Sequence, residues 1–437
     1  MINNNKLINY IIVVLFVVMI GFKISNNELF LLYNNILCYL CIFIVIVGSI
    51  YFTIKLKFLQ FNVFKMVESI KSSSISDVKA LFMSMGAKIG VGSIVGISLA
   101  IYVSGPGVLL WIWIISLLSS ILTYCESYLG CMYKRDDQGG VFYYISRGLN
   151  NKGLSIIYTF ILVFVYAVGF VGIQSNTIVK SIDHVINIDK YVVVIGLCLF
   201  IAMIIFNNIK SIIDFMAILV PIMCIFYIVF GLFILLKDID RLIFIINLIL
   251  EDGLRLDRAI IGIIIVGLQR GIFATEAGIG TSSIASSISS DDKIGQGIFQ
   301  VMGVHFISLV IVTITGFIII GSDYSYIGTI NGVEIIFDIF SHYYGFFGKL
   351  GLCIVIILFA VSTIVSGYYY TVKGVQFLKE NLSSAGTFFI KILVVLLVFM
   401  GGVVDSTIIW SIIDTLVLFL LLINIYAIFC LRKFIAT

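Results

Sequence analysis

The chain has 437 residues, of which 61% are hydrophobic and only 11% are charged, and its mean hydropathy is +1.19. Soluble domains are about 45–50% apolar and about 25% charged, so this composition excludes a soluble globular protein and predicts an all-α polytopic membrane protein. The net charge of +4 comes from Lys and Arg in short loops rather than from a basic face, which excludes nucleic acid as a partner.

Runs long and apolar enough to span a bilayer recur along the whole chain, because a spanning helix needs about 20 such residues. They fall at 8–25, 32–53, 79–103, 107–133, 154–180, 191–208, 212–236, 259–287, 296–321, 347–372, 385–403 and 406–430. The first run is short and follows a single lysine, as a signal peptide does. No small-residue cleavage site follows it, so we expect an uncleaved helix.

The positive residues of the short loops predict the orientation of the helices. If the runs alternate in direction, one side of the membrane receives Lys55, Lys57, Lys65, Lys71, Lys134, Arg135, Arg147, Lys152, Lys210, Lys373, Lys379, Arg432 and Lys433. This side is predicted to be cytoplasmic, and both termini lie on it. The basic residues of the opposite side are accompanied by several acidic ones.

Two of the predicted helices are interrupted by glycine pairs beside a hydroxyl residue. The run 79–103 contains Gly90-Val-Gly92-Ser93, and the run 259–287 contains Gly278-Ile-Gly280-Thr281. Glycine weakens a helix by about 1 kcal/mol relative to alanine, and broken helices in membranes free backbone amides and carbonyls that hold anions and cations. Glycines four residues apart are also a common packing motif, but two matched motifs in opposed helices favour a binding site.

Five charged residues lie inside apolar runs, where an unpaired charge would cost several kcal/mol. They are Lys88, Glu126, Arg270, Glu276 and Asp414. Lys88 and Glu276 lie beside the glycine interruptions. Each of the five is expected to face protein or water, either in a structural ion pair or on the route of a sodium ion or proton.

No catalytic or metal-binding motif is apparent, so we do not expect an enzyme. The eight cysteines lie within apolar runs, which favours neither disulfides nor metal ligation. His184, His305 and His342 are scattered over separate segments.

In these features the chain resembles the alanine/glycine:cation symporter family, also called sodium:alanine symporters, from about Gly48 to Asn424. The motifs that carry the resemblance are Phe58-Leu-Gln-Phe61, Gly90 to Gly96, Gly105-Pro-Gly107 with Trp111 and Trp113, Glu126, Gly139-Gly140-Val-Phe-Tyr-Tyr-Ile145 with Gly148-Leu149, Gln174-Ser-Asn176, Pro221, Arg270-Gly-Ile-Phe273 with Glu276-Ala-Gly-Ile-Gly280, Phe359-Ala360 with Tyr368-Tyr-Tyr370, and Asp414 with Asn424. So many motifs in the same order make the resemblance specific.

The resemblance implies a leucine-transporter-like fold, which consists of two inverted five-helix repeats after leading helices. Residues 1–78 would then hold one or two leading helices and a cytoplasmic linker, and 79–236 the first repeat with core helices 1–5. Residues 237–258 would form an extracellular connector, and 259–437 the second repeat with core helices 6–10 and a short cytoplasmic tail.

The resemblance also implies two sets of site residues. The unwound core helices 1 and 6 would contact the amino acid through Gly90, Val91, Gly92, Ser93, Ala274, Thr275, Ala277 and Gly278. Gln174 and Gly367 would form walls of the pocket. A sodium ion would be held by backbone oxygens near Gly86 and Ile89 and by the hydroxyls of Ser362 and Thr363, which are the hard oxygen ligands that Na⁺ prefers. The two hydroxyls could instead only bond back to their own helix.

At several pocket positions the chain departs from the family. The family usually has Asn at Ser93, a Ser-Asn pair at Ala274-Thr275 and Trp at Gly367. A pocket with these changes should be wider and less polar than one built for alanine or glycine, so a somewhat larger neutral amino acid is an equally reasonable ligand.

The function expected from these features is sodium-coupled symport of a small neutral amino acid into the cell by alternating access. Na⁺ would be a co-transported ion rather than a prosthetic group, and the amino acid and the lipid bilayer would be the other partners, with no obligate protein partner evident. The expected location is the plasma membrane, which in a bacterium is the inner membrane. The alternative is a transporter-like protein that has an altered substrate or senses an amino acid without transporting it.

Overall fold

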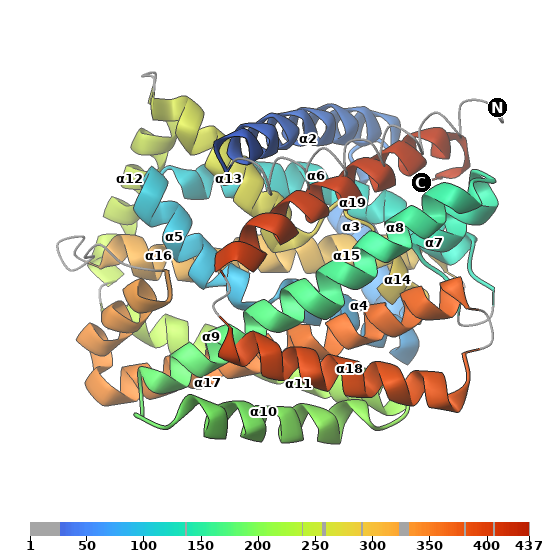
Figure 1. Cartoon of the computed structure of the whole chain (residues 1–437). Helices are drawn as coiled ribbons and strands as arrows, with labels where there is room; N and C mark the ends of the chain where they lie inside the picture. Colours follow the sequence, from blue (N-terminus) through green and yellow to red (C-terminus); the bar gives the residue numbers. More distant parts are fainter. Residues whose placement is uncertain are drawn as a thin grey trace.

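The computed structural model describes residues 27–135, 138–237, 239–255, 259–289, 292–322, 332–379, 382–404 and 407–436. Within these ranges the chain is almost entirely helical and contains no β-strand, only an isolated bridge between Arg135 and Gln138. Most helices run roughly side by side in one bundle (Figure 1). The first predicted run, 8–25, lies outside the described residues.

The longer helices follow the predicted runs, with one exception. They are α2 (Asn27–Lys55), α4 (Ile75–Lys88), α5 (Val95–Ser104), α6 (Val108–Met132), α8 (Lys152–Phe164), α9 (Val171–Asp183), α10 (Lys190–Ile205), α11 (Ile209–Lys237), α13 (Ala259–Thr275), α15 (Lys293–Phe306), α16 (Val312–Gly321), α17 (Gly332–Leu378), α18 (Ser384–Val403) and α19 (Thr407–Cys430). The exception is α17, which begins 15 residues before the run 347–372 and is kinked at Gly345, where φ is 56°. Two pairs of helices are each joined by a π-helical turn. The turn η4 (Val165–Phe170) joins α8 to α9, and the turn η6 (Ile307–Ile311) joins α15 to α16.

Within the described residues, eight helices are long and apolar enough to cross a membrane, and a ninth span results if the bent pair formed by α4 and α5 is counted. Two shorter apolar helices lie at 190–205 and 262–275. Together these elements correspond to the predicted runs from 32–53 to 406–430. The chain is therefore an integral membrane protein.

Two further helices lie in segments where no spanning helix was expected, and a third is the second half of a broken one. The helix α3 (Val63–Ser72) lies in the linker between α2 and α4, and α12 (Leu242–Leu254) lies in the predicted connector 237–258. The short helix α14 (Thr281–Ser286) continues α13 after a break. Their shortness explains why a search for runs of about 20 apolar residues does not detect α3 and α12.

The first glycine-interrupted helix is broken as the sequence predicts. A capping box of Ser74 and Asp77 begins α4, and the helix ends at Lys88 with Ile89 as its C-cap. Gly90 is extended, with φ −101° and ψ −170°, and the short 3₁₀ turn η2 (Val91–Ser93) leads into α5. The two halves are bent by 67° relative to each other. A Cβ on Gly90 would lie 2.7 Å from Thr363 Oγ1, so this close approach requires glycine.

The second interrupted helix is broken between Thr275 and Thr281. Glu276, Gly278 and Gly280 have positive φ angles of 50°, 84° and 111°. This alternation cannot continue a helix, and glycine adopts it without strain at two of the three positions. Tyr158 on α8 binds the unwound backbone, because its hydroxyl donates a hydrogen bond to the Ile279 carbonyl at 2.6 Å.

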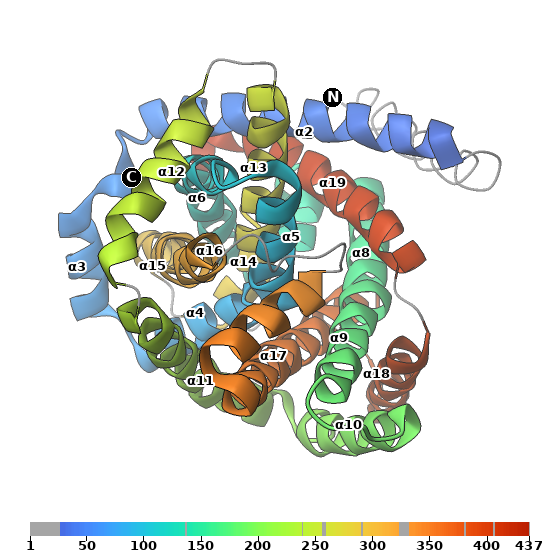
Figure 2. The same cartoon turned by 90° about the vertical axis from the view of Figure 1, so that its left-hand side faces the viewer.

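The two broken helices lie in the interior of the bundle. Figure 2, which looks nearly along helices such as α6, α15 and α16, shows α5, α13 and α14 near the centre, with α2, α3, α10 and α18 toward the outside. The long helix α6 packs against both α13 and α15, and α17 packs against α4 and α9. Outer helices such as α10 and α18 expose large apolar side chains, as lipid contact requires.

Candidate functional site

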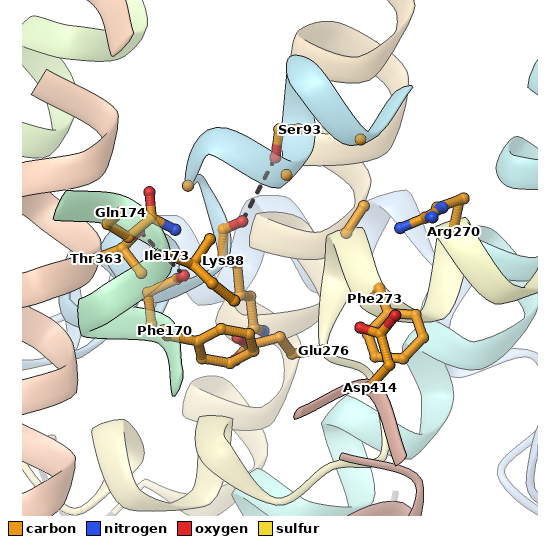
Figure 3. Close-up of a pocket in the computed structure, with 15 residues that line it drawn as sticks. Lys88, Ser93, Phe170, Ile173, Gln174, Arg270, Phe273, Glu276, Thr363 and Asp414 are labelled. Atoms are coloured by element: carbon orange, nitrogen blue, oxygen red, sulfur yellow. Dashed lines mark hydrogen bonds between the residues drawn. The ribbon is translucent and has the colours of Figure 1, made fainter. Parts of the chain in front are cut away.

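A cavity lies between the two broken helices and is closed on its other sides by α9, α17 and α19 (Figure 3). Its lining consists of Ala87, Lys88, Gly90, Gly92, Ser93, Gly96, Phe170, Ile173, Gln174, Arg270, Phe273, Ala274, Glu276, Thr363 and Asp414. Its volume is about 70 Å³, on a scale on which one water molecule needs about 10–15 Å³. The cavity therefore has room for several waters or one small solute.

Polar side chains of neighbouring helices satisfy some of the backbone groups that the first break frees. The Val91 N–H donates to Gln174 Oε1 at 3.2 Å, and Ser93 Oγ lies 3.4 Å from the Lys88 carbonyl. The Ser93 carbonyl accepts a hydrogen bond from Thr315 Oγ1 at 3.2 Å. These bonds hold the broken backbone open beside the cavity instead of allowing it to close into a helix.

Carbonyl and hydroxyl oxygens gather where α17 meets the end of α4. Ser362 Oγ lies 3.1 Å from the Gly86 carbonyl oxygen, and Thr363 Oγ1 lies 3.2 Å from it and 3.5 Å from the Ala87 carbonyl oxygen. Both hydroxyls are also within 2.8–3.1 Å of the Phe359 carbonyl of their own helix. The described residues contain no cluster of His, Cys, Asp or Glu suited to a metal ion, so any ion here would rely on neutral oxygens.

This arrangement of oxygens suits a small hard cation. Each hydroxyl has one hydrogen, and if Ser362 and Thr363 donate to Phe359 in their own helix, their lone pairs face the Gly86 carbonyl. Oxygens at such distances are joined either by a hydroxyl hydrogen donated to the carbonyl or by a cation that lies between them. A cation with bonds of about 2.4 Å to oxygen has neighbouring ligands about 3.4 Å apart, close to the separations observed.

Lys88 and Glu276 lie at the inner side of the cavity and are almost fully buried, with 5% and 4% of their surface exposed. The Lys88 ammonium donates to Ser282 Oγ at 2.8 Å, which joins the end of α4 to α14. The Glu276 carboxylate accepts a hydrogen bond from Thr281 Oγ1 at 2.8 Å. Both charges are thus hydrogen-bonded within the second broken helix.

Glu126 on α6 is fully buried behind the second break and does not line the cavity. Asn424 on α19 donates from Nδ2 to Glu126 Oε2 at 2.9 Å and to the Gly278 carbonyl at 2.8 Å, and its Oδ1 accepts from the Tyr144 hydroxyl. One amide therefore fixes the buried carboxylate and the unwound backbone together.

Arg270 and Asp414 lie at the outer side of the cavity. Both also line a larger vestibule of about 500 Å³, on the same scale, whose other ionisable residues are Lys180, Asp183, His184 and Glu334. The cavity and the vestibule share Gly96 as well. The vestibule is thus the hollow that adjoins the cavity, and these two side chains stand between them.

Ten of the expected site residues line the cavity, Thr363 of the sodium set among them, and the others lie elsewhere. Gly90, Gly92, Ser93, Gln174 and Ala274 line the cavity, as do the charges Lys88, Arg270, Glu276 and Asp414. Gly86, Ile89 and Ser362 lie next to it, at the oxygen cluster or at the end of α4. Val91, Thr275, Ala277, Gly278 and Gly367 are not among the lining residues.

The residues outside the lining have other partners. The Thr275 hydroxyl donates to the Gly271 carbonyl of its own helix at 2.8 Å. A Cβ on Gly278 would contact Leu122 and Leu421, and a Cβ on Gly367 would lie 3.4 Å from the Tyr166 carbonyl. These two glycines therefore face neighbouring helices.

Sequence reasoning missed three apolar lining residues, Phe170, Ile173 and Phe273, and the Ala87 carbonyl. Apolar residues in apolar helices give no signal of their own. Phe170 ends the π-helical turn η4, and such turns are frequent at functional sites, but a π-helical turn leaves no clear pattern in a single sequence.

Two broken helices around a small cavity that is lined in part by charged residues are an arrangement typical of secondary transporters. The family model of the sodium:alanine symporter family matches residues 8–437, so the chain belongs to this family. Family membership makes it a transporter of the sodium-coupled amino-acid class.

Several curated relatives are similar over most of their length. The chain is 30% identical to the amino-acid carrier protein AlsT of Bacillus subtilis, covering 89% of this chain and 86% of the relative. It is 30% identical to the probable sodium/glutamine symporter GlnT of the same organism, covering 89% and 84%. It is 29% identical to the sodium/alanine symporter AgcS of Methanococcus maripaludis, covering 84% and 86%.

A solved structure supports the expected fold. The chain is similar to MhsT in its complex with L-phenylalanine, with a TM-score of 0.54 and 16% identity, covering 82% of this chain and 88% of MhsT. This likeness confirms the leucine-transporter-like fold. The bounds of the two repeats stay a prediction.

Proposed function

We propose that the chain carries a small neutral amino acid into the cell together with Na⁺, by alternating access about the central cavity. The observation that carries this proposal is the position of Thr363, which lines the cavity and also belongs to the oxygen cluster around the Gly86 carbonyl. An ion at the cluster and an amino acid in the cavity would therefore be neighbours. Adjacent sites allow one ligand to strengthen the binding of the other, which symport requires.

The size and charge of the cavity support a small zwitterion as the substrate. A volume of about 70 Å³ corresponds to about five to seven water-sized positions, comparable to the non-hydrogen atoms of glycine, alanine or serine. The lining has two basic residues, Lys88 and Arg270, and two acidic ones, Glu276 and Asp414. Relatives named for alanine and for glutamine show that the family includes substrates of different size.

In this proposal each broken helix contacts a different part of the substrate. Freed amides near Gly92 and Ser93 bind the carboxylate, as helix N-termini bind anions. Ala274 and Glu276 contact the substrate from the second break, and Gln174 forms a wall. Na⁺ is held by Gly86, Ala87, Ser362 and Thr363, with Ile89 at the end of the same helix.

The vestibule gives the cavity an approach from the side on which α9 ends and α17 begins. We place this side outside the cell, because the loops richest in Lys and Arg lie at the opposite ends of the helices. The membrane in question is the plasma membrane, which is the inner membrane in a bacterium.

The test is uptake by the purified chain in proteoliposomes. Radiolabelled alanine, glycine, serine and glutamine are offered with an inward Na⁺ gradient or with an equal K⁺ gradient. We expect at least one of them to accumulate only with Na⁺. Binding of an amino acid without accumulation would overturn symport and indicate a non-transporting relative, and accumulation driven equally by K⁺ would overturn the coupling to sodium.

A further inference from the structure

The helix α3 differs from α15, the spanning helix that it packs against, in its direction and in its surface. Figure 2 shows it lengthwise at the edge of the bundle, whereas α15 is seen nearly end-on. Asn62 caps it by accepting from the Lys65 N–H at 3.1 Å, and its inner side, with the buried Ser69, packs on α15. It therefore lies across the bundle, between the end of α2 and the start of α4.

The outer side of α3 is apolar, and no described element covers it. Phe64 is 90% exposed, and Val63, Val67 and Ile70 are each 44–65% exposed. Phe58 and Phe61, just before the helix, are also exposed. A contiguous apolar surface of this kind in a membrane protein marks a contact with lipid or with another protein.

Basic side chains accompany this surface. Lys57 precedes α3, and Lys65 and Lys71 lie on it beside a single acidic residue, Glu68. Lys79 pairs with Asp214 and Arg255 pairs with Asp252, and neither ion pair involves these lysines. The chain's basic end lies nearby, because the Lys55 ammonium donates to the Arg432 carbonyl.

We propose that α3 is an interfacial helix whose apolar side enters the headgroup region of the adjoining leaflet and whose lysines bind anionic phospholipids. An amphipathic helix with lysines on its polar face and aromatic residues on the other is typical of helices that lie in the membrane plane. The lysines favour phospholipid over a second protein, because a bilayer with anionic headgroups complements both the charge and the apolar surface. Each such lysine strengthens the interaction about fivefold.

This lipid contact has a structural consequence for the site. Only Ser73 and Ser74 separate α3 from α4, and Ser74 caps α4 in a box with Asp77. The other end of α4 carries the Gly86 and Ala87 carbonyls of the oxygen cluster. A helix fixed in the leaflet thus holds the start of the same segment that supplies the ion ligands.

The depth of α3 is tested with tryptophan as a reporter. Phe64→Trp is compared with Phe43→Trp, which is exposed near the middle of α2, and the spectrum of the unmodified chain is subtracted. Both are reconstituted in phosphatidylcholine vesicles brominated either near the headgroup or near the chain ends. We expect headgroup bromines to quench the reporter at 64 most strongly and chain-end bromines to quench the reporter at 43.

The lipid preference is tested by energy transfer from the tryptophan at 64 to dansyl-labelled phosphatidylglycerol or phosphatidylcholine. The preference for phosphatidylglycerol should fall about fivefold for each of Lys65→Gln and Lys71→Gln. Lys190→Gln, an exposed lysine on α10, is the matched control and should leave it unchanged. The proposal would be overturned if bromine did not quench the reporter at 64 or quenched it only from the chain ends. It would also be overturned if a second copy of the chain shielded the reporter in a concentration-dependent way, or if energy transfer to the two lipids were equal. None of these readouts depends on transport.

Discussion

Replacing Gly92 by leucine should abolish uptake without unfolding the protein. A Cβ at this position would meet no atom within 4 Å, although Gly92 lines the cavity. The backbone can therefore accept a side chain, which points into the space proposed for the substrate. Of the roughly five to seven water-sized positions in the cavity, the four carbons of leucine would take more than half.

The magnitude can be graded by side-chain size. One added methyl group in a binding pocket costs about 1–3 kcal/mol, or about 10–200-fold in specificity, so Gly92→Ala should reduce serine and alanine uptake more than glycine uptake. Gly92→Leu should reduce all three below detection. Gly196→Leu is the control, because Gly196 on α10 is also free of neighbours within 4 Å and is exposed.

Uptake is measured in proteoliposomes, and folding is checked by thermal unfolding and by gel filtration in detergent. Both leucine variants should unfold at temperatures close to that of the unmodified chain. Transport by Gly92→Leu at the rate of Gly196→Leu would refute the location of the substrate in this cavity.

Two other predictions concern Asn424 and the charge of the substrate. Asn424→Ala removes the donor to Glu126 Oε2 and to the Gly278 carbonyl, so it should lower the free energy of unfolding by about 2–4 kcal/mol in thermal unfolding. The control Asn207→Ala, at an exposed residue, should change little. Equal unfolding temperatures for the two variants would contradict the role given to Asn424. Lysine and glutamate should fail to inhibit alanine uptake even at 100 times the alanine concentration. The cavity has equal numbers of basic and acidic residues, so the net charge of either amino acid would stay unpaired there, at a cost of several kcal/mol. Inhibition by either one equal to that by serine would contradict this charge balance.

The helical architecture and the two breaks could be predicted from the sequence because each has a local cause. Long apolar runs define the spans, and the pairs Gly90 with Gly92 and Gly278 with Gly280 weaken the helix where it breaks. The positive φ of Glu276 has no such signal, because it arises from the backbone path between these glycines. Short helices such as α3 were missed, although the cap residue Asn62 and the spacing of Val63, Val67 and Ile70 are signals that could have indicated it.

The site could be predicted only in part because its walls come from helices distant in the sequence. Charged residues in apolar runs, such as Arg270 and Asp414, could be recognised from the sequence as candidate site residues. The apolar lining of Phe170 and Phe273 depends on which face of each helix turns inward, and that depends on packing between helices. Likewise, Gly278 is placed against Leu122 and Leu421 rather than in the cavity by the path of the unwound segment.

The sodium dependence of uptake by Thr363→Ala and Thr371→Ala tests the central claim most directly. Both hydroxyls are buried on α17, but Thr371 Oγ1 donates to the Gly367 carbonyl of its own helix, whereas Thr363 Oγ1 faces the Gly86 and Ala87 carbonyls of α4. Loss of one ligand to a charge costs about 1.5–3 kcal/mol. The Na⁺ concentration for half-maximal uptake should therefore rise about 10- to 100-fold in Thr363→Ala, recover in Thr363→Ser and stay unchanged in Thr371→Ala. An unchanged Na⁺ dependence in Thr363→Ala would contradict a sodium site between α4 and α17.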